Sequence, residues 1–306
     1  MRTAPGQLFL TALDRTSPSA GPAVTASAFV PDHDHHRGSF VGRAFPLFLD
    51  AAGERVNVPA GLLAALSARL SRSVSGEDVK AYVAALLAHP VYTAHFHADL
   101  LTPGLRVPLT ANAASFADAV ALGRRVLWLH TYGRCFADAA AGRPAGAPRV
   151  VQGDRPLVVT PIPDSPDAMP EEIVHDPALA QLRVGAGVIE GVPEPVWDYE
   201  VSGFRVVKRW FDRRKREPEG NRSSPLDHLV ATSWEPEWTE ELIDLLNVLR
   251  LLVDLEPQQA DLLDQVLAGP MVTTEELRAA VVLPSTDITP ARDRPTPEKP
   301  ARQSQL

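Results

Sequence analysis

The sequence predicts an α+β protein in which strands and helices occupy separate parts of the chain. Its 306 residues are 45% hydrophobic and 22% charged, close to the globular average, which excludes wholesale disorder. The 29 prolines divide the chain into short elements and exclude a bundle of long helices. Runs of β-branched residues and runs with helical periodicity also follow one another in blocks. These three observations together predict the mixed class.

The first block, residues 1–57, is predicted to be a small β-rich N-terminal segment. Residues 7–13, 23–30 and 44–50 are short apolar or β-branched runs, and turn-forming stretches separate them. This pattern is typical of strands joined by tight connections. We therefore expect three short strands in this block.

The second block, residues 58–136, is predicted to be a helical spacer. Pro59 stands where proline is favoured, in the first turn of a helix. Ser75 and Asp78 form a capping-box pattern, with Asp in place of the usual Glu, ahead of a second helix. Residues 116–132 carry an apolar stripe at helical spacing and predict a third.

The rest of the chain is predicted to contain a linker, a second mixed lobe and a tail. Residues 137–156 are rich in Ala, Gly, Pro and Arg without periodicity, as in a linker. A mixed α/β lobe is expected over 157–285, with separate helices over 238–255 and 258–267. Residues 286–306 are Pro-rich and polar, so a disordered tail is expected.

Charge and cysteine content narrow the class of protein. The formal net charge of −8 excludes a chain that coats nucleic acid over its whole surface, so any such contact has to be local. Cys135, the single cysteine, can form neither an intramolecular disulfide nor a Cys-rich zinc site, and we expect it to be a small buried side chain. We find no signal peptide and no run of about 18 apolar residues. These observations predict a cytoplasmic protein without membrane contact.

Catalytic motifs are missing from the sequence. We find no G-x-x-x-x-G-K-[ST] phosphate loop, no G-x-G-x-x-G after a strand, no G-x-S-x-G elbow and no H-E-x-x-H pair. The Asn-Pro-Pro-aromatic segment with which amino-methyltransferases hold a flipped base is also missing. We therefore expect no catalytic residue, no cofactor and no enzyme activity of this chain on its own.

Two histidine groups could be mistaken for metal sites. They are His33, Asp34, His35 and His36 in one loop, and His89, His95 and His97 around a turn. Imidazole and carboxylate ligands suit zinc or iron, but adjacent residues of one loop rarely converge on a single ion. A solvated loop is favoured for the first group, and helix-end or surface positions for the second. No metal site is expected.

One short segment is basic although the chain as a whole is acidic. Residues 205–222 contain eight basic and three acidic side chains, a local charge of +5 against −13 for the other residues. The pattern predicts a helix over 204–216, with arginines gathered within about 80° on one face and Trp210 and Phe211 on the opposite, buried side. Arginine suits forked contacts with phosphate and guanine. A solvated face is the alternative, and a membrane-surface helix is disfavoured because its aromatic residues are expected in the core. The candidate DNA-binding residues are Arg205, Lys208, Arg209, Arg213, Arg214, Lys215, Arg216 and Arg222.

Four stretches resemble segments of one protein family and occur in the same order. They are 43–49 (RAFPLFL), 80–109 (KAYVAALLAHPVYTAHFHADLLTPGLRVPL), 116–132 (FADAVALGRRVLWLHTY) and 196–214 (VWDYEVSGFRVVKRWFDRR). Together they are similar to the C-terminal specificity domain of type ISP restriction-modification enzymes. The resemblance extends over about residues 7–283.

Complete type ISP proteins join a nuclease, a helicase-like ATPase, an adenine-N6 methyltransferase and this domain, and the first three have no counterpart in this sequence. The resemblance implies a target-recognition lobe over 157–285 that contacts double-stranded DNA, beside a spacer packed on the methyltransferase. It places four of the candidate cations on the family's signature helix: Arg205, Lys208, Arg209 and Arg213. Four aromatic residues match its aromatic positions and are assigned to packing: Trp197, Tyr199, Phe204 and Trp210.

Two functional hypotheses follow. The first is a DNA sequence-recognition module, acting alone or with a separately encoded methyltransferase or helicase–nuclease. The alternative is a docking subunit or degenerate remnant that associates with a separate DNA methyltransferase and binds no DNA. A third, an enzyme in its own right, would require binding of S-adenosylmethionine.

Overall fold

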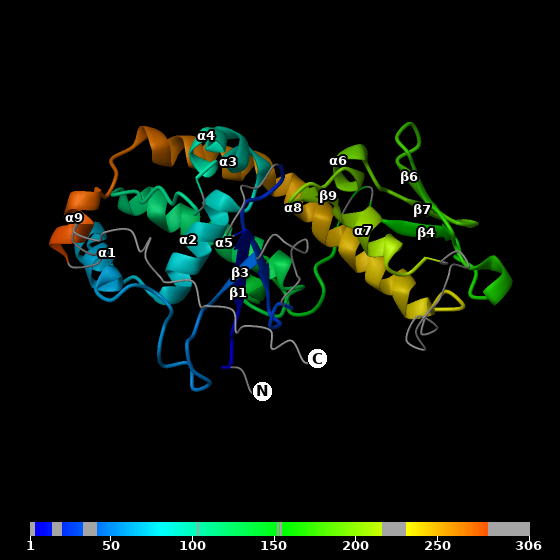
Figure 1. The fold of residues 1–306 in the computed structure, drawn as a ribbon, viewed down its shortest axis with the longest axis horizontal. Helices are drawn as coiled ribbons and strands as arrows, with labels where there is room; N and C mark the ends of the chain where they lie inside the picture. The colour runs from blue at the N-terminus through cyan, green and yellow to red at the C-terminus, as the bar shows by residue number, and fades with distance from the viewer. Residues whose placement is uncertain are drawn as a thin grey trace, which may run out of the picture.

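The structure is a computed structural model that describes residues 4–13, 20–32, 42–102, 104–151, 153, 155–215 and 231–280. Figure 1 shows two groups of elements side by side, with the long helix α8 (Pro236–Ala268) running through both. One group holds a three-stranded sheet and the first helices of the chain, and the other holds a four-stranded sheet and two short helices. The predicted α+β class is confirmed.

The N-terminal sheet is antiparallel, with strand order β2-β1-β3. Its strands are β1 (Phe9–Leu13), β2 (Thr25–Ser27) and β3 (Gly42–Pro46), and each overlaps one of the three predicted runs. Leu8, Leu10 and Leu47 are buried here, which anchors the sheet in the core it shares with the helices. The β-rich N-terminal segment therefore forms as expected.

Five helices follow the sheet: α1 (Leu62–Leu70), α2 (Gly76–Leu87), α3 (Pro90–His95), α4 (His97–Leu100) and α5 (Ala113–His130). The predicted capping box opens α2, since Ser75 Oγ accepts from the Asp78 amide at 3.1 Å and Asp78 Oδ2 accepts from the Ser75 amide at 3.0 Å. The prediction for Pro59 was wrong. Gly61 caps α1 instead, in the left-handed region with φ 81°, and the helix begins after it.

Helices α2 and α5 pack closely at the centre of this group. A Cβ atom on Gly123 would overlap the carbonyl oxygen of Ala81, so only glycine allows this approach of the two backbones. The neighbouring rings of Tyr82 and Phe116 stack with their centroids 4.9 Å apart. The Tyr82 hydroxyl donates to the Pro108 carbonyl at 2.6 Å and accepts from the Thr110 amide at 2.9 Å, which fixes the extended segment before α5.

The second sheet is antiparallel, with strand order β4-β7-β6-β5. Its strands are β4 (Leu157–Thr160), β5 (Ile173–Asp176), β6 (Gln181–Val184) and β7 (Gly187–Glu190). Leu182, Val184 and Ile189 are fully buried on one face, as period-two alternation requires. The short helix α6 (Glu194–Trp197) follows the sheet and contacts α8.

Helix α8 corrects the prediction of two helices over 238–255 and 258–267, because it continues through Pro257. Proline removes one backbone hydrogen bond from a helix, but its ring is exposed here. The buried stripe runs through the proline without a change of spacing: Leu252, Leu255, Gln259, Leu262, Leu263 and Val266. The buried Gln259 amide also donates to the Ala85 carbonyl near the end of α2 at 2.9 Å. Packing of the α8 residues on both sides of Pro257 thus outweighs the tendency of proline to end a helix.

The region predicted as a linker packs against the helices where it is described. The Trp128 indole donates to the Pro144 carbonyl at 3.0 Å, and the Val150 amide donates to Asn247 Oδ1 of α8 at 2.9 Å. The domain boundaries proposed from the sequence stay a prediction. The expected tail, 286–306, and the loop histidines His33, His35 and His36 lie outside the described residues.

Two further searches cover only this described part of the chain. None of its helices is long and apolar enough to cross a membrane. Within the same residues, no group of three or more His, Cys, Asp or Glu side chains could hold a metal ion. Cys135 is buried as predicted, with its sulfur 3.7 Å from the Gln7 carbonyl oxygen.

His89 differs from its expected surface position. His95 and His97 are exposed, but His89, which precedes the first residue of α3, is fully buried. Neither ring nitrogen of His89 meets a partner at hydrogen-bonding geometry among the described residues. Burial lowers the pKa of His89 to about 4, an effect that the nearby Leu86 carbonyl only partly offsets.

This buried histidine predicts acid sensitivity. Above its ordinary pKa of about 6.5 the ring is neutral in both folded and unfolded chains; below it the unfolded chain binds a proton that the folded chain excludes. Stability is therefore lost as pH falls from about 6.5 towards 4. Urea unfolding at about pH 7 and about pH 4.5 should show that His89→Leu removes about 2–3 kcal/mol of this loss. His95→Leu is the control, and an unchanged loss in His89→Leu would contradict the assignment.

Candidate nucleic-acid interface

The basic segment forms two elements rather than the single helix that its pattern predicts. Ser202 and Gly203, with φ 53° and 79°, turn the chain into a hairpin of β8 (Glu200–Val201) and β9 (Phe204–Arg205). Helix α7 (Val206–Asp212) starts only after this hairpin and is followed by one further turn. Arg205 and Arg213 therefore lie just outside α7, and the predicted single stripe of arginines on one helix is wrong. Arg216 and Arg222 lie outside the described residues.

The apolar side of α7 is anchored, as expected. Val207 and Phe211 are buried, and α7 contacts both α6 and α8. The fully buried ring of Trp234 lies 6.3 Å from Phe211 and 6.1 Å from Trp210, centroid to centroid. The Trp234 indole donates to Thr239 Oγ1 at 2.9 Å. The basic segment therefore stands on a rigid aromatic support.

Three of the candidate cations are held by neighbours. The Arg214 guanidinium lies 4.1 Å above the Trp210 ring and bonds Glu241 of α8 at 2.8 Å. Lys208 and Lys215 both pair with Asp212, at 3.5 Å and 3.2 Å. Arg214 thus contributes to the packing of α7 on α8, in which cation–π contact stabilises the pair.

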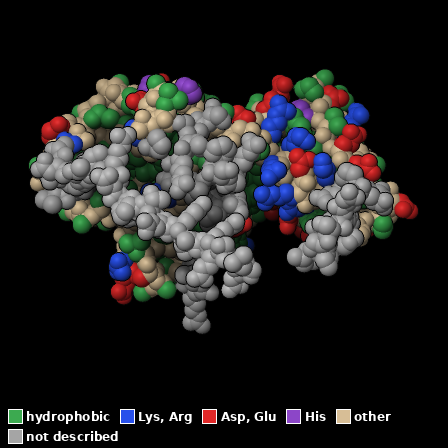
Figure 2. All heavy atoms as spheres, in the orientation of Figure 1, with side chains coloured by type: hydrophobic (Ala, Val, Ile, Leu, Met, Phe, Trp, Pro, Cys, Tyr) green, Lys and Arg blue, Asp and Glu red, His purple; other side chains and the backbone are tan. Residues whose placement is uncertain are grey.

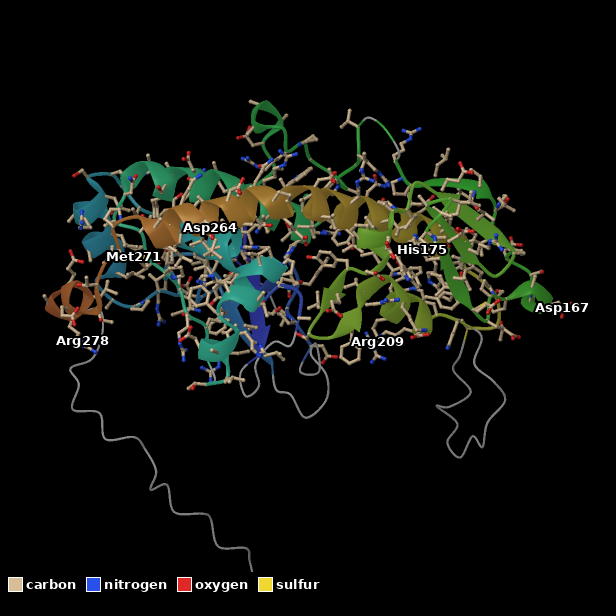
Figure 3. All side chains as sticks on the ribbon, turned by 90° about the horizontal axis from the view of Figure 1, so that it is seen from above. Asp167, His175, Arg209, Asp264, Met271 and Arg278 are labelled. Atoms are coloured by element: carbon tan, nitrogen blue, oxygen red, sulfur yellow. The ribbon has the colours of Figure 1, made fainter. Side chains whose placement is uncertain are left out.

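The other described cations are exposed. Arg205 pairs with Asp198 at 3.0 Å, and Arg209 lies 5.5 Å above the Phe204 ring. Neither Arg209 nor Arg213 forms an ion pair with any residue that the structure describes. Figure 2 shows Lys and Arg side chains gathered over this half of the molecule, and Figure 3 shows Arg209 at its outer edge. Arg209 and Arg213 can therefore bind an anionic surface without displacing a carboxylate of the described residues.

An acidic cleft of about 360 Å³ borders the basic surface. Its lining includes Asp198, Tyr199, Glu200 and Glu256. Burial raises the pKa of the Glu256 carboxyl to about 7. The Asp198 and Glu200 carboxylates, of which Asp198 pairs with Arg205, disfavour phosphate in this cleft.

Comparison with protein families decides what kind of domain this is. The family described as the type ISP C-terminal specificity domain matches residues 1–245. The chain belongs to this family. A comparison with curated protein sequences finds no match.

The specificity domain is also similar in fold to parts of solved structures. One is the cryoEM structure of a DrdV–DNA complex, with a TM-score of 0.57, 20% identity, and coverage of 88% of this chain and 25% of that one. A second is a nuclease-deletion mutant of the type ISP restriction-modification enzyme LlaGI in complex with a DNA substrate mimic. Its TM-score is 0.51 at 18% identity, and the match covers 85% of this chain and 21% of that one. A third is the ATP-dependent type ISP restriction-modification enzyme LlaBIII bound to DNA. Its TM-score is 0.56 at 13% identity, and the match covers 87% of this chain and 16% of that one. This chain thus spans a quarter or less of the chains that it matches.

Sequence reasoning missed the partners that hold the basic segment. Trp238 and Glu241 come from α8 and Trp234 from the segment just before it, some 20 residues or more further along the chain. One local signal was available, since Trp210 and Arg214 stand four residues apart and could meet on one helical face. Three of the four aromatic residues that the resemblance assigned to packing do pack: Tyr199 is buried, the half-buried Trp197 stacks on His175, and Trp210 contacts the core.

Proposed function

We propose that this specificity domain is the DNA sequence-recognition module of a type ISP-like restriction-modification or adenine methyltransferase system, without catalytic activity of its own. The observation that carries the proposal is the exposed pair Arg209 and Arg213, which have no ion-pair partner in the described structure and stand on an anchored element. Similar folds occur in proteins solved as complexes with DNA or a DNA substrate mimic, which also supports a role in DNA binding. A separately encoded methyltransferase or helicase–nuclease is the proposed protein partner.

The proposed chemistry divides two tasks. Exposed arginines and lysines supply affinity through phosphate contacts, which carry no sequence information. Base contacts supply sequence preference and require side chains held in fixed orientations. The proposal assigns both tasks to cations within eleven residues, from Arg205 to Lys215. The acidic remainder of the chain restricts binding to this surface.

Salt dependence tests the proposal. Fluorescence anisotropy with a mixed-sequence duplex should show binding that weakens by about 10- to 150-fold between about 50 and about 200 mM salt, as expected for two to four phosphate contacts. Binding that is absent at the lowest salt would reject the DNA-recognition proposal.

Docking on a separate methyltransferase is the second candidate function. The outer face of the second sheet favours protein contact, since Leu157, Val159 and Val174 are all exposed there. If DNA binding is absent, co-purification of a methyltransferase from the host would select this candidate. If both are found, the domain serves as a link between the enzyme and its target.

A further inference from the structure

Arg205 differs from the other exposed cations because its orientation is fixed. Its Nη2 lies 3.0 Å from Asp198 Oδ1, and its guanidinium lies 5.9 Å above the Trp197 ring. The Trp197 ring in turn stacks on His175, with centroids 5.7 Å apart and planes 13° apart. His175 Nε2 is hydrogen-bonded to the Val192 carbonyl at 2.7 Å, so the stack continues to the core of the sheet. Figure 3 labels both residues and shows His175 nearer the interior of the molecule than Arg209.

The hairpin also positions the backbone of Arg205. Arg205 pairs with Glu200 across β8 and β9, and the Val206 amide donates to the Tyr199 carbonyl at 2.9 Å. The side chain is nevertheless 49% exposed. It therefore combines a fixed orientation with access to a ligand.

Within the basic segment, none of the other described cations has both properties. Arg209 and Arg213 are exposed but lack a carboxylate that would orient them among the described residues. Arg214 is oriented, but the Trp210 ring and Glu241 cover it. Lys208 and Lys215 carry single ammonium groups, which cannot make the forked contact of a guanidinium.

We infer that Arg205 reads a guanine base in the DNA major groove and that Asp198 is its positioning residue. This inference rests on the proposed function. A guanidinium has five N–H donors, and the ion pair with Asp198 occupies one end of the fork. The remaining donors match O6 and N7 of guanine, the most common specific contact of arginine with DNA. The carboxylate of Asp198 also offsets the charge of Arg205, so this residue contributes more to sequence preference than to phosphate binding.

Selection from a pool of randomised duplexes tests the inference. The wild-type protein, Arg205→Lys, Asp198→Asn and Arg125→Lys are each used to select bound DNA, which is then sequenced. We expect the wild-type site to contain a guanine whose preference over other bases falls by about 10- to 100-fold in Arg205→Lys, because lysine keeps the charge but loses the fork. Asp198→Asn should weaken the same preference partially. Arg125→Lys, an exposed arginine of α5 outside the basic segment, is the matched control and should leave it unchanged.

Each outcome has a separate meaning. If Arg205→Lys selects the wild-type site with undiminished guanine preference, the inference is overturned while the proposed function stands. If the wild-type protein binds no duplex at all, the proposed function fails first. Thermal unfolding of the variants checks that the hairpin is intact, and Asp198→Asn provides a second test if Arg205→Lys fails to fold.

Discussion

The double variant Arg209→Glu, Arg213→Glu is expected to lose DNA binding by about 100-fold or more at about 50 mM salt. Both guanidiniums are exposed, and neither has an ion-pair partner in the part of the chain that the structure describes. Their replacement removes two phosphate contacts and places two negative charges against the DNA backbone. Anisotropy titrations should also show a salt slope reduced by about 2, because two fewer counterions are released.

A matched control separates this local effect from a change in net charge. Arg55 and Arg125 are exposed arginines of the other group of elements, so Arg55→Glu, Arg125→Glu alters the net charge by the same amount. This control should bind DNA within about threefold of the wild-type protein. Equal losses in both double variants would mean that DNA responds to the overall charge and that the α7 surface has no special role.

Enlarging Gly123 is expected to have the largest effect on stability. Its backbone lies so close to Ala81 of α2 that a methyl group cannot fit without separating the two helices. We expect Gly123→Ala to lower the free energy of unfolding by about 2–4 kcal/mol, even though alanine favours the helix by about 1 kcal/mol. Gly123→Leu should prevent folding altogether.

Urea unfolding followed by far-ultraviolet circular dichroism measures this effect. Ala121→Leu, on the exposed side of the same helix, is the control and should change stability by less than about 0.5 kcal/mol. A Gly123→Ala variant as stable as the wild-type protein would mean that α2 and α5 can move apart without loss of packing.

Local signals in the sequence predicted much of the fold. The capping box at Ser75 and Asp78 predicted the start of α2, and short apolar or β-branched runs predicted the N-terminal strands. Such signals act between residues close together in the chain, where periodicity and capping are sufficient. The charge excess of the basic segment was visible for the same reason.

Contacts between distant residues account for what the sequence could not predict. The cation–π cage of Arg214 depends partly on Trp238, and the continuity of α8 through Pro257 depends on packing against other helices. The helical pattern of 204–216 overlooked the turn at Ser202 and Gly203, which recruits Phe204 and Arg205 into a hairpin. Periodicity predicts which residues share a helical face but does not identify the partner of each charge. The sequence therefore could not distinguish Arg214, which Glu241 and Trp210 hold, from the exposed Arg209.

Because α8 is unbroken over 33 residues, it sets a fixed distance between the two groups of elements that it joins. At 1.5 Å per residue its axis is about 50 Å long, close to the length of about 15 base pairs of B-form DNA. Its first turns hold the aromatic support of α7, and its last turns pack beside the helices of the N-terminal group. A protein bound at the C-terminal end of α8 would therefore hold the basic surface at a fixed distance of about 50 Å.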